Sequence, residues 1–235
     1  MNLILLLPDD LVDGTRARLS GRRLRHVQEV HRACAGDTLA VGLLGGQIGI
    51  GTVTRLDEAV LEMDILLDRD PPAGLPLTIV LALPRPKVLR RVLFSMTVMG
   101  VKRIILVNAA RVEKSYWQSP FLAPDAVTRQ LLLGLEQARD TMLPEVLLRQ
   151  RFKPFVEDEL PAVMEGTLPL VAHPGAQGAC PREVRGPVTL AVGPEGGFVP
   201  YEIEKFISLD FTAVSLGERV LNVETVVPAL IGHIF

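Results

Sequence analysis

A glycine-rich segment near the C-terminus has the residue types of a ligand-binding loop. It reads Gly193-Pro194-Glu195-Gly196-Gly197 and lies between an apolar run at 188–192 and a helix predicted at 200–207. Three glycines allow the backbone to adopt positive φ and to approach a ligand closely. Because open α/β sheets usually bind ligands at the carboxyl ends of their strands, the segment predicts a binding site. A tight connection that needs glycine only for its geometry is the alternative.

Two familiar nucleotide-binding loops do not fit this segment. No Lys-Ser or Lys-Thr pair follows the glycines, which excludes a P-loop. The spacing G-x-G-x-x-G after a first strand is absent too. An ordinary Rossmann fold, for a dinucleotide or a methyl donor, would place its glycine loop near the beginning of the chain rather than in the last fifth.

A second loop follows, and it reads Ser215-Leu216-Gly217-Glu218-Arg219-Val220-Leu221. It joins a strand predicted at 211–214 to a helix predicted at 223–234. Two such loops from adjacent strands are expected to wall one pocket. Glu224 and Thr225 open the last helix, where capping by Thr225 is the structural alternative to a role in chemistry.

Several arginines are candidates for contacts with negative charge. Arg139 lies near the end of a helix predicted at 124–142 and could face phosphate or a developing negative charge. A solvated cation at a helix end is the alternative. The stretch 85–103 has no acid, which favours a surface that contacts phosphates, and its basic residues are Arg85, Lys87, Arg90, Arg91, Lys102 and Arg103.

The elements that must position these residues change in type along the chain. Strands with glycine turns are predicted over 38–66, after a short helix at 24–31, and indicate a small antiparallel barrel. The proline-rich stretch 70–76 is predicted to be a linker. Strands and helices then alternate, which predicts an α/β domain with a mostly parallel sheet. The expected domains are 1–70 and 76–235. In the second domain, strands are predicted at 77–83, 104–107, 146–148, 168–172, 188–192 and 211–214. Helices are predicted there at 87–99, 124–142, 200–207 and 223–234.

The charge of the chain is unevenly distributed. In 235 residues, 25 basic and 27 acidic side chains give a net charge of −2 and a pI of about 6.1, which taken alone argues against nucleic-acid binding. Residues 14–32, however, carry +5 and residues 85–103 carry +6, whereas 54–70 and 155–165 carry −4 each. The distribution predicts one basic face whose binding to RNA weakens steeply with salt.

Other classes of protein are disfavoured by what the sequence contains. Cys34 and Cys180 are far apart, and the four histidines lack the spacing of metal ligands, so we expect neither a disulfide framework nor a metal site. The N-terminal apolar run is about five residues long and has no basic segment before it. We therefore expect no signal peptide, no membrane span and a cytoplasmic protein.

Together these motifs resemble the RsmE family, which are small-subunit rRNA methyltransferases of the SPOUT, or α/β-knot, superfamily. The resemblance is carried by the Gly193–Gly197 loop, by Ser215-Leu216-Gly217 with Arg219-x-Leu221, and by Glu224-Thr225. Further matches are Glu136-Gln137-x-Arg139, Gly100-Val101, Arg25-His26 and Gly36-Asp37.

The resemblance implies a fold and a reaction. It implies an N-terminal PUA-like RNA-binding barrel, a C-terminal domain with a trefoil knot, a homodimer, and methylation of N3 of a uridine in 16S rRNA from S-adenosylmethionine. Arg139, Arg219 and Glu224 would act in catalysis, and Arg22, Arg23, Arg25, Arg85, Lys87, Arg90 and Arg91 would contact RNA. The cofactor would lie among Ala172, Val192, Gly193, Pro194, Glu195, Gly196, Gly197, Ser215, Leu216, Gly217, Val220 and Leu221.

The sequence departs from the family pattern at three positions. Asn222 replaces the usual arginine, and Ser95 and Val98 replace the usual lysine and glutamate of the first helix. These departures keep open an RNA-binding or assembly protein with weak or lost turnover, and a methyltransferase of another RNA. A non-RNA α/β enzyme that binds a nucleotide with its glycine loops is the third alternative.

Overall fold

In the computed structural model, which describes residues 2–235, the chain forms two compact units. One unit contains Met1–Ala73 and Leu132–Leu143, and the other contains Gly74–Leu131 and Pro144–Phe235. Residues 132–143 fall inside the predicted C-terminal domain 76–235, but their contacts group them with the N-terminal unit.

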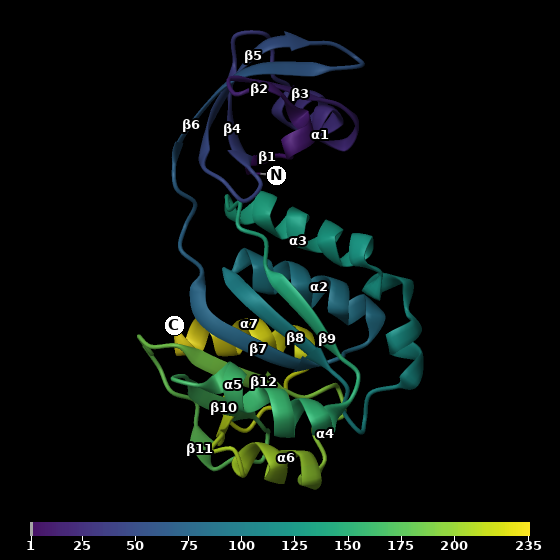
Figure 1. The fold of residues 1–235 in the computed structure, drawn as a ribbon, viewed down its shortest axis with the longest axis vertical. Coiled ribbons are helices and arrows are strands. Elements are labelled where there is room, and N and C mark those ends of the chain that lie inside the picture. The colour runs from purple at the N-terminus through teal and green to yellow at the C-terminus, as the bar shows by residue number, and fades with distance from the viewer. Residues whose placement is uncertain (1) are drawn as a thin grey trace. The chain divides into compact units, whose positions relative to one another are not determined.

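The first unit is built on a curled sheet of six strands (Figure 1). Its order is β1-β4-β5-β6-β3-β2, and every pair is antiparallel except β1 and β4. The strands predicted over 38–66 pair antiparallel, as expected, and β1, which lies outside that range, adds a parallel edge to the sheet. The strands are β1 (Ile4–Leu6), β2 (Leu11–Asp13), β3 (Arg16–Leu19), β4 (Thr38–Leu43), β5 (Ile48–Leu56) and β6 (Leu61–Arg69).

A helical segment and the end of a long helix complete the first unit. The helix predicted at 24–31 is α1 (Gly21–His26) followed by a π-helical turn, η2 (Val27–His31), and Arg32 ends it with φ 51°. Leu24 and Val27 enter the core between the strands. Leu135, from the last turns of α3 (Pro124–Ala138), packs with Leu3 and Leu5 in a separate small cluster.

The second unit contains a seven-stranded sheet in which every pair is parallel. This confirms the predicted α/β class, and the order is β11-β13-β10-β12-β7-β8-β9. All five residues of β12 are buried, as expected of a strand covered on both faces. The strands are β7 (Leu75–Ala82), β8 (Val101–Val107), β9 (Glu145–Arg149), β10 (Leu168–Ala172), β11 (Gly178–Ala179), β12 (Val188–Val192) and β13 (Thr212–Ser215).

Helices cover this sheet on both faces. α2 and α7 pack on each other on one side, whereas α4, α5 and α6 lie on the other side (Figure 1). Short 3-10 turns, η1 (Pro8–Asp10), η3 (Lys114–Gln118) and η4 (Pro120–Leu122), connect elements along the chain. The helical elements are α2 (Pro86–Val98), α4 (Phe152–Pro154), the π-helical η5 (Phe155–Glu159), α5 (Leu160–Met164), α6 (Pro200–Ile207) and α7 (Val223–Ile234).

Two predicted boundaries are wrong for identifiable reasons. The linker predicted at 70–76 ends too late, because β7 begins at Leu75 and includes Pro76. The pairing of β7 with β8 shifts register between Leu75 and Thr78, and the pairing of β7 with β12 begins only at Leu77. Proline, which has no N–H to donate, is therefore tolerated at position 76. The helix predicted to reach residue 142 ends at Ala138, because Arg139 adopts φ 57°.

Candidate functional site

One cavity of about 270 Å³ lies at the carboxyl ends of β10, β12 and β13. The loops that follow these strands, together with one face of α7, form its walls. Arg219 also lines this cavity. So do all of the residues predicted to bind the cofactor, namely Ala172, Val192, Gly193, Pro194, Glu195, Gly196, Gly197, Ser215, Leu216, Gly217, Val220 and Leu221.

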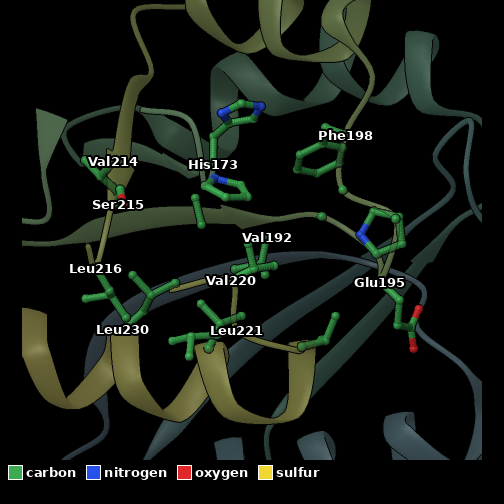
Figure 2. Close-up of a pocket in the computed structure, with 18 of the residues that line it drawn as sticks. His173, Val192, Glu195, Phe198, Val214, Ser215, Leu216, Val220, Leu221 and Leu230 are labelled. Carbon is green, nitrogen blue, oxygen red and sulfur yellow. The ribbon is translucent and has the colours of Figure 1, made fainter. Parts of the chain in front are cut away.

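The cavity has one strongly apolar side. Figure 2 shows Leu216, Leu221 and Leu230 on one side of it, with His173 and Phe198 across from them. His173, Phe198 and Leu230 were not predicted. The spacing of Leu230 from Val223 and Val226 in the sequence is the helical signal that marks one face of α7.

Two glycines of the loops are required by geometry. A Cβ at Gly193 would lie 2.9 Å from the main-chain nitrogen of Phe198, so only glycine fits this turn. Gly217 has φ +117°, a conformation that is strained for any residue with a side chain. Its turn is closed by Ser215, whose Oγ accepts a hydrogen bond from the Gly217 N–H at 3.0 Å. Main-chain groups therefore approach the cavity closely from both loops.

Residues outside the loops hold the first loop in shape. Arg111 donates to the carbonyl oxygen of Gly196. Glu202, which is 2% exposed, accepts hydrogen bonds from the N–H groups of Ala110 at 2.7 Å and Val199 at 2.9 Å. The sequence gives no signal for either Arg111 or Glu202. The groups that they bind are far away in the chain or belong to a local turn, so no motif marks them.

The start of α7 differs from the expectation. Asn222, not Thr225, is the N-cap, and its side-chain oxygen accepts the Thr225 N–H at 2.8 Å. The asparagine that departs from the family pattern thus satisfies a main-chain donor of the last helix. Glu224 forms an exposed ion pair with Arg91 at 3.1 Å. The structure therefore joins one predicted catalytic residue to one predicted RNA-binding residue.

A basic groove lies along α2. Lys87, Arg90, Arg91 and Phe94 recur at helical spacing, and with Ser95, Phe121 and Gln130 they line a groove of about 460 Å³. The guanidinium of Arg90 stacks 5.0 Å above the ring of Phe121. Cations beside aromatic rings suit both phosphates and unstacked bases.

The arginines of α1 have different environments. Arg23 is only 16% exposed and makes a bidentate contact with Asp10 at 2.5 and 2.8 Å. Arg22 contacts Glu136 in the same way, although it is exposed, as is Arg25. Arg139, also exposed, belongs to this first unit, while Arg219 and Glu224 belong to the second.

Within residues 2–235, no group of three or more His, Cys, Asp and Glu side chains is placed to hold a metal ion. None of the helices in this range is long and apolar enough to cross a membrane.

Comparisons with known proteins identify the relatives of this chain. Residues 71–234 match the model of the RNA methyltransferase domain family. A ribosomal RNA small subunit methyltransferase E from Treponema pallidum is 30% identical over 235 residues, which cover 96% of this chain and 87% of that protein. The protein of the same name from Synechocystis is 24% identical, with 94% and 73% covered.

Solved structures share the fold over nearly the whole length. A ribosomal RNA small subunit methyltransferase E from Neisseria gonorrhoeae, bound to S-adenosylmethionine, superposes with a TM-score of 0.74 at 23% identity and covers 98% of this chain and 95% of that one. A Legionella pneumophila protein in complex with the same cofactor gives 0.72 at 23% identity, with 97% and 95% covered. The chain therefore belongs to the ribosomal RNA small subunit methyltransferase E family.

Proposed function

We propose that this chain transfers a methyl group from S-adenosylmethionine to N3 of a uridine in small-subunit (16S) rRNA. The observation that carries the proposal is the cavity walled by the loops after β12 and β13 in a member of this family. The relatives bound to S-adenosylmethionine support the identity of the cofactor.

The residues of the cavity fit this cofactor. Main-chain groups of Gly193, Gly197 and Gly217 come close enough to bind its polar parts, because these positions carry no Cβ. Leu216, Leu221 and the face of α7 provide an apolar wall for a purine ring. When bound, S-adenosylmethionine supplies an electrophilic methyl group.

The protein's own task is to position the uridine and to stabilise its anion. N3 of uridine is weakly acidic and must lose its proton, so negative charge develops on the base. Arg139 and Arg219 are the groups that we assign to this charge. Glu224 is assigned to positioning Arg91, since these two side chains are paired. The base must also be unstacked to reach the cofactor.

The RNA backbone would contact basic residues of each unit. At the start of α2 and along it, the exposed Arg85, Lys87, Arg90 and Arg91 form a basic surface, and the last three of them line the groove. On α1, Arg25 has no hydrogen-bond or ion-pair partner among residues 2–235 and is available for phosphates, whereas Arg22 and Arg23 are already engaged with carboxylates. We assign the larger part of phosphate binding on α1 to Arg25.

We extend the proposal to assembly and location on the family resemblance alone. The chain would act as a homodimer without a metal ion, and it would work in the cytoplasm, where ribosomal subunits are assembled. Sedimentation equilibrium of the purified protein measures the assembly state directly.

Mass-spectrometric mapping of rRNA methylation tests the activity. Small ribosomal subunits from cells that lack this protein are incubated with S-adenosylmethionine and either the purified protein or its Gly196→Arg variant. We expect one new N3-methyluridine in 16S rRNA with the unaltered protein only. Methylation of another RNA would contradict the substrate, and cofactor binding without methyl transfer to any RNA would favour an RNA-binding or assembly role.

A further inference from the structure

The turn after α3 presents an arginine in an unfavourable conformation. Arg139 has φ 57°, in the left-handed region that non-glycine residues rarely adopt. The N–H of Asp140 donates to the carbonyl of Leu135 at 3.0 Å, which closes the helix end in the manner usually made with glycine. Strain of this kind persists only where the surroundings impose it, and it often accompanies function.

The surroundings of this turn fix it on several sides. Glu136 accepts hydrogen bonds at its carbonyl from the N–H groups of Asn2 and Leu3, both at 3.0 Å. Thr141 donates to the carbonyl of Gly46 in the loop between β4 and β5. Glu136 and Thr141, on either side of Arg139, are therefore both bound to segments that flank strands of the N-terminal sheet.

The Glu136 side chain is a buried charge at this contact. It is 3% exposed, and its two oxygens accept hydrogen bonds from the guanidinium of Arg22 at 2.9 and 2.6 Å. A carboxylate at this depth is stable as an ion only when it is paired. The pair thus ties α1 to the last turn of α3, three residues before Arg139.

Arg139 itself stays available. It is exposed, and among residues 2–235 its guanidinium has no hydrogen-bond or ion-pair partner. An exposed guanidinium without a partner inside the protein can bind a negatively charged ligand.

We propose that Glu136, through its pair with Arg22, is a positioning residue that fixes Arg139 against the RNA substrate. The N-terminal sheet, α1 and Arg139 then contact the RNA as one rigid block. This inference rests on the proposed function, because it gives Arg139 a role in binding the uridine anion or the phosphate beside it.

A double-mutant cycle tests the coupling. Arg139→Ala, Glu136→Gln and the double variant are compared in single-turnover methylation and in equilibrium binding to 16S rRNA in small subunits. Misplacing a catalytic group by a small distance can cost up to about 100-fold in rate, so we expect Arg139→Ala to lose about 100-fold and Glu136→Gln about 10-fold. The double variant should be no slower than Arg139→Ala, because Glu136 acts only through Arg139.

Controls separate positioning from stability. Arg149→Lys weakens a partly exposed arginine–glutamate pair of the other unit, with Glu159, and should change neither rate nor RNA affinity. Arg22→Lys keeps the charge beside Glu136 but not the bidentate geometry, and we expect a loss between those of the other variants. The cofactor affinity of all variants should stay unchanged in calorimetry, since the cavity is formed by the other unit.

The outcomes distinguish this inference from the proposed function. Additive losses from Arg139→Ala and Glu136→Gln would overturn the positioning role and leave the methyltransferase assignment intact. A fully active Arg139→Ala variant would remove Arg139 from the site and overturn the inference with it. Absence of methylation by the unaltered protein would instead reject the proposed function.

Discussion

The carboxylate of Glu195 accepts a hydrogen bond from the main-chain N–H of Arg85 at 2.9 Å. Arg85 is the N-cap of α2, and the N–H groups at the start of a helix have no acceptor within the helix itself. Glu195, the acidic residue of the glycine loop, supplies such an acceptor. Figure 2 shows this carboxylate directed away from the centre of the cavity. Glu195 therefore ties the loop after β12 to the start of the basic helix.

Removing this carboxylate should affect stability more than cofactor binding. We expect Glu195→Ala to lower the free energy of unfolding in urea by about 1 kcal/mol, the usual cost of a lost helix cap. The dissociation constant of S-adenosylmethionine in calorimetry should change by less than about threefold. Glu218→Ala, in the second loop, is the matched control and should change neither quantity. Loss of cofactor affinity at unchanged stability would show that Glu195 contacts the cofactor instead.

Filling the cavity from Gly196 should abolish cofactor binding. A Cβ at Gly196 would lie 3.0 Å from Cδ of Arg111, so a long side chain must displace that arginine or enter the cavity. We expect the Gly196→Arg variant to remain folded, as judged by circular dichroism, but to show no heat of S-adenosylmethionine binding. Gly186→Arg is the control, because Gly186 is exposed and has open space around it. Normal binding by the Gly196→Arg variant would reject the cavity as the cofactor site.

The sequence predicts best those elements that have continuous apolar runs with clear ends. β12 and α7 have the predicted bounds, because glycine or proline limits the strand and a capping sequence begins the helix. β3 was missed, since its Arg-Ala-Arg-Leu pattern buries only alternate residues and resembles a charged loop. The knot that the family resemblance implies depends on how loops pass one another, which periodicity does not encode.

The features of the candidate site likewise fall into those that the sequence predicts and those that it does not. Both glycine loops could be predicted, because they follow buried strands and need unusual backbone conformations. The Glu195–Arg85 and Glu136–Arg22 contacts join residues more than a hundred positions apart, so no local pattern reveals them. Only the folded chain shows that Arg22, predicted to contact RNA, is engaged with a buried carboxylate.

Asn222 should stabilise the last helix. Its side chain caps α7 through the Thr225 N–H, so Asn222→Ala should lower the free energy of unfolding by about 1 kcal/mol in urea titrations. Asn222→Asp keeps the acceptor and should retain the stability. Equal losses in both variants would indicate that the asparagine acts through contacts other than the cap.

His26 should make stability depend on pH. Burial holds the pKa of His26 below its usual value near 6.5, with His31 adding to the effect, and within residues 2–235 its buried Nε2 has no hydrogen-bond partner. The unfolded chain therefore binds a proton more readily than the folded one, so stability should fall as the pH drops below about 6.5. Urea titrations between pH 8 and pH 5 measure this slope, which should be shallower in His26→Leu. Equal slopes would assign the pH dependence to another group.

Arg139→Gly should separate stability from function. Glycine adopts the left-handed conformation of this position freely, so we expect the free energy of unfolding to rise by roughly 0.5–1 kcal/mol. Methylation should nevertheless be lost, because the guanidinium that we assign to the uridine anion is gone. Asp210→Gly is the control, since Asp210 has φ 63° in the turn after α6 and lies outside the site. It should gain less stability, because aspartate adopts this conformation more easily than arginine, and it should keep full activity. An active Arg139→Gly variant would show that the strained arginine has no part in the reaction.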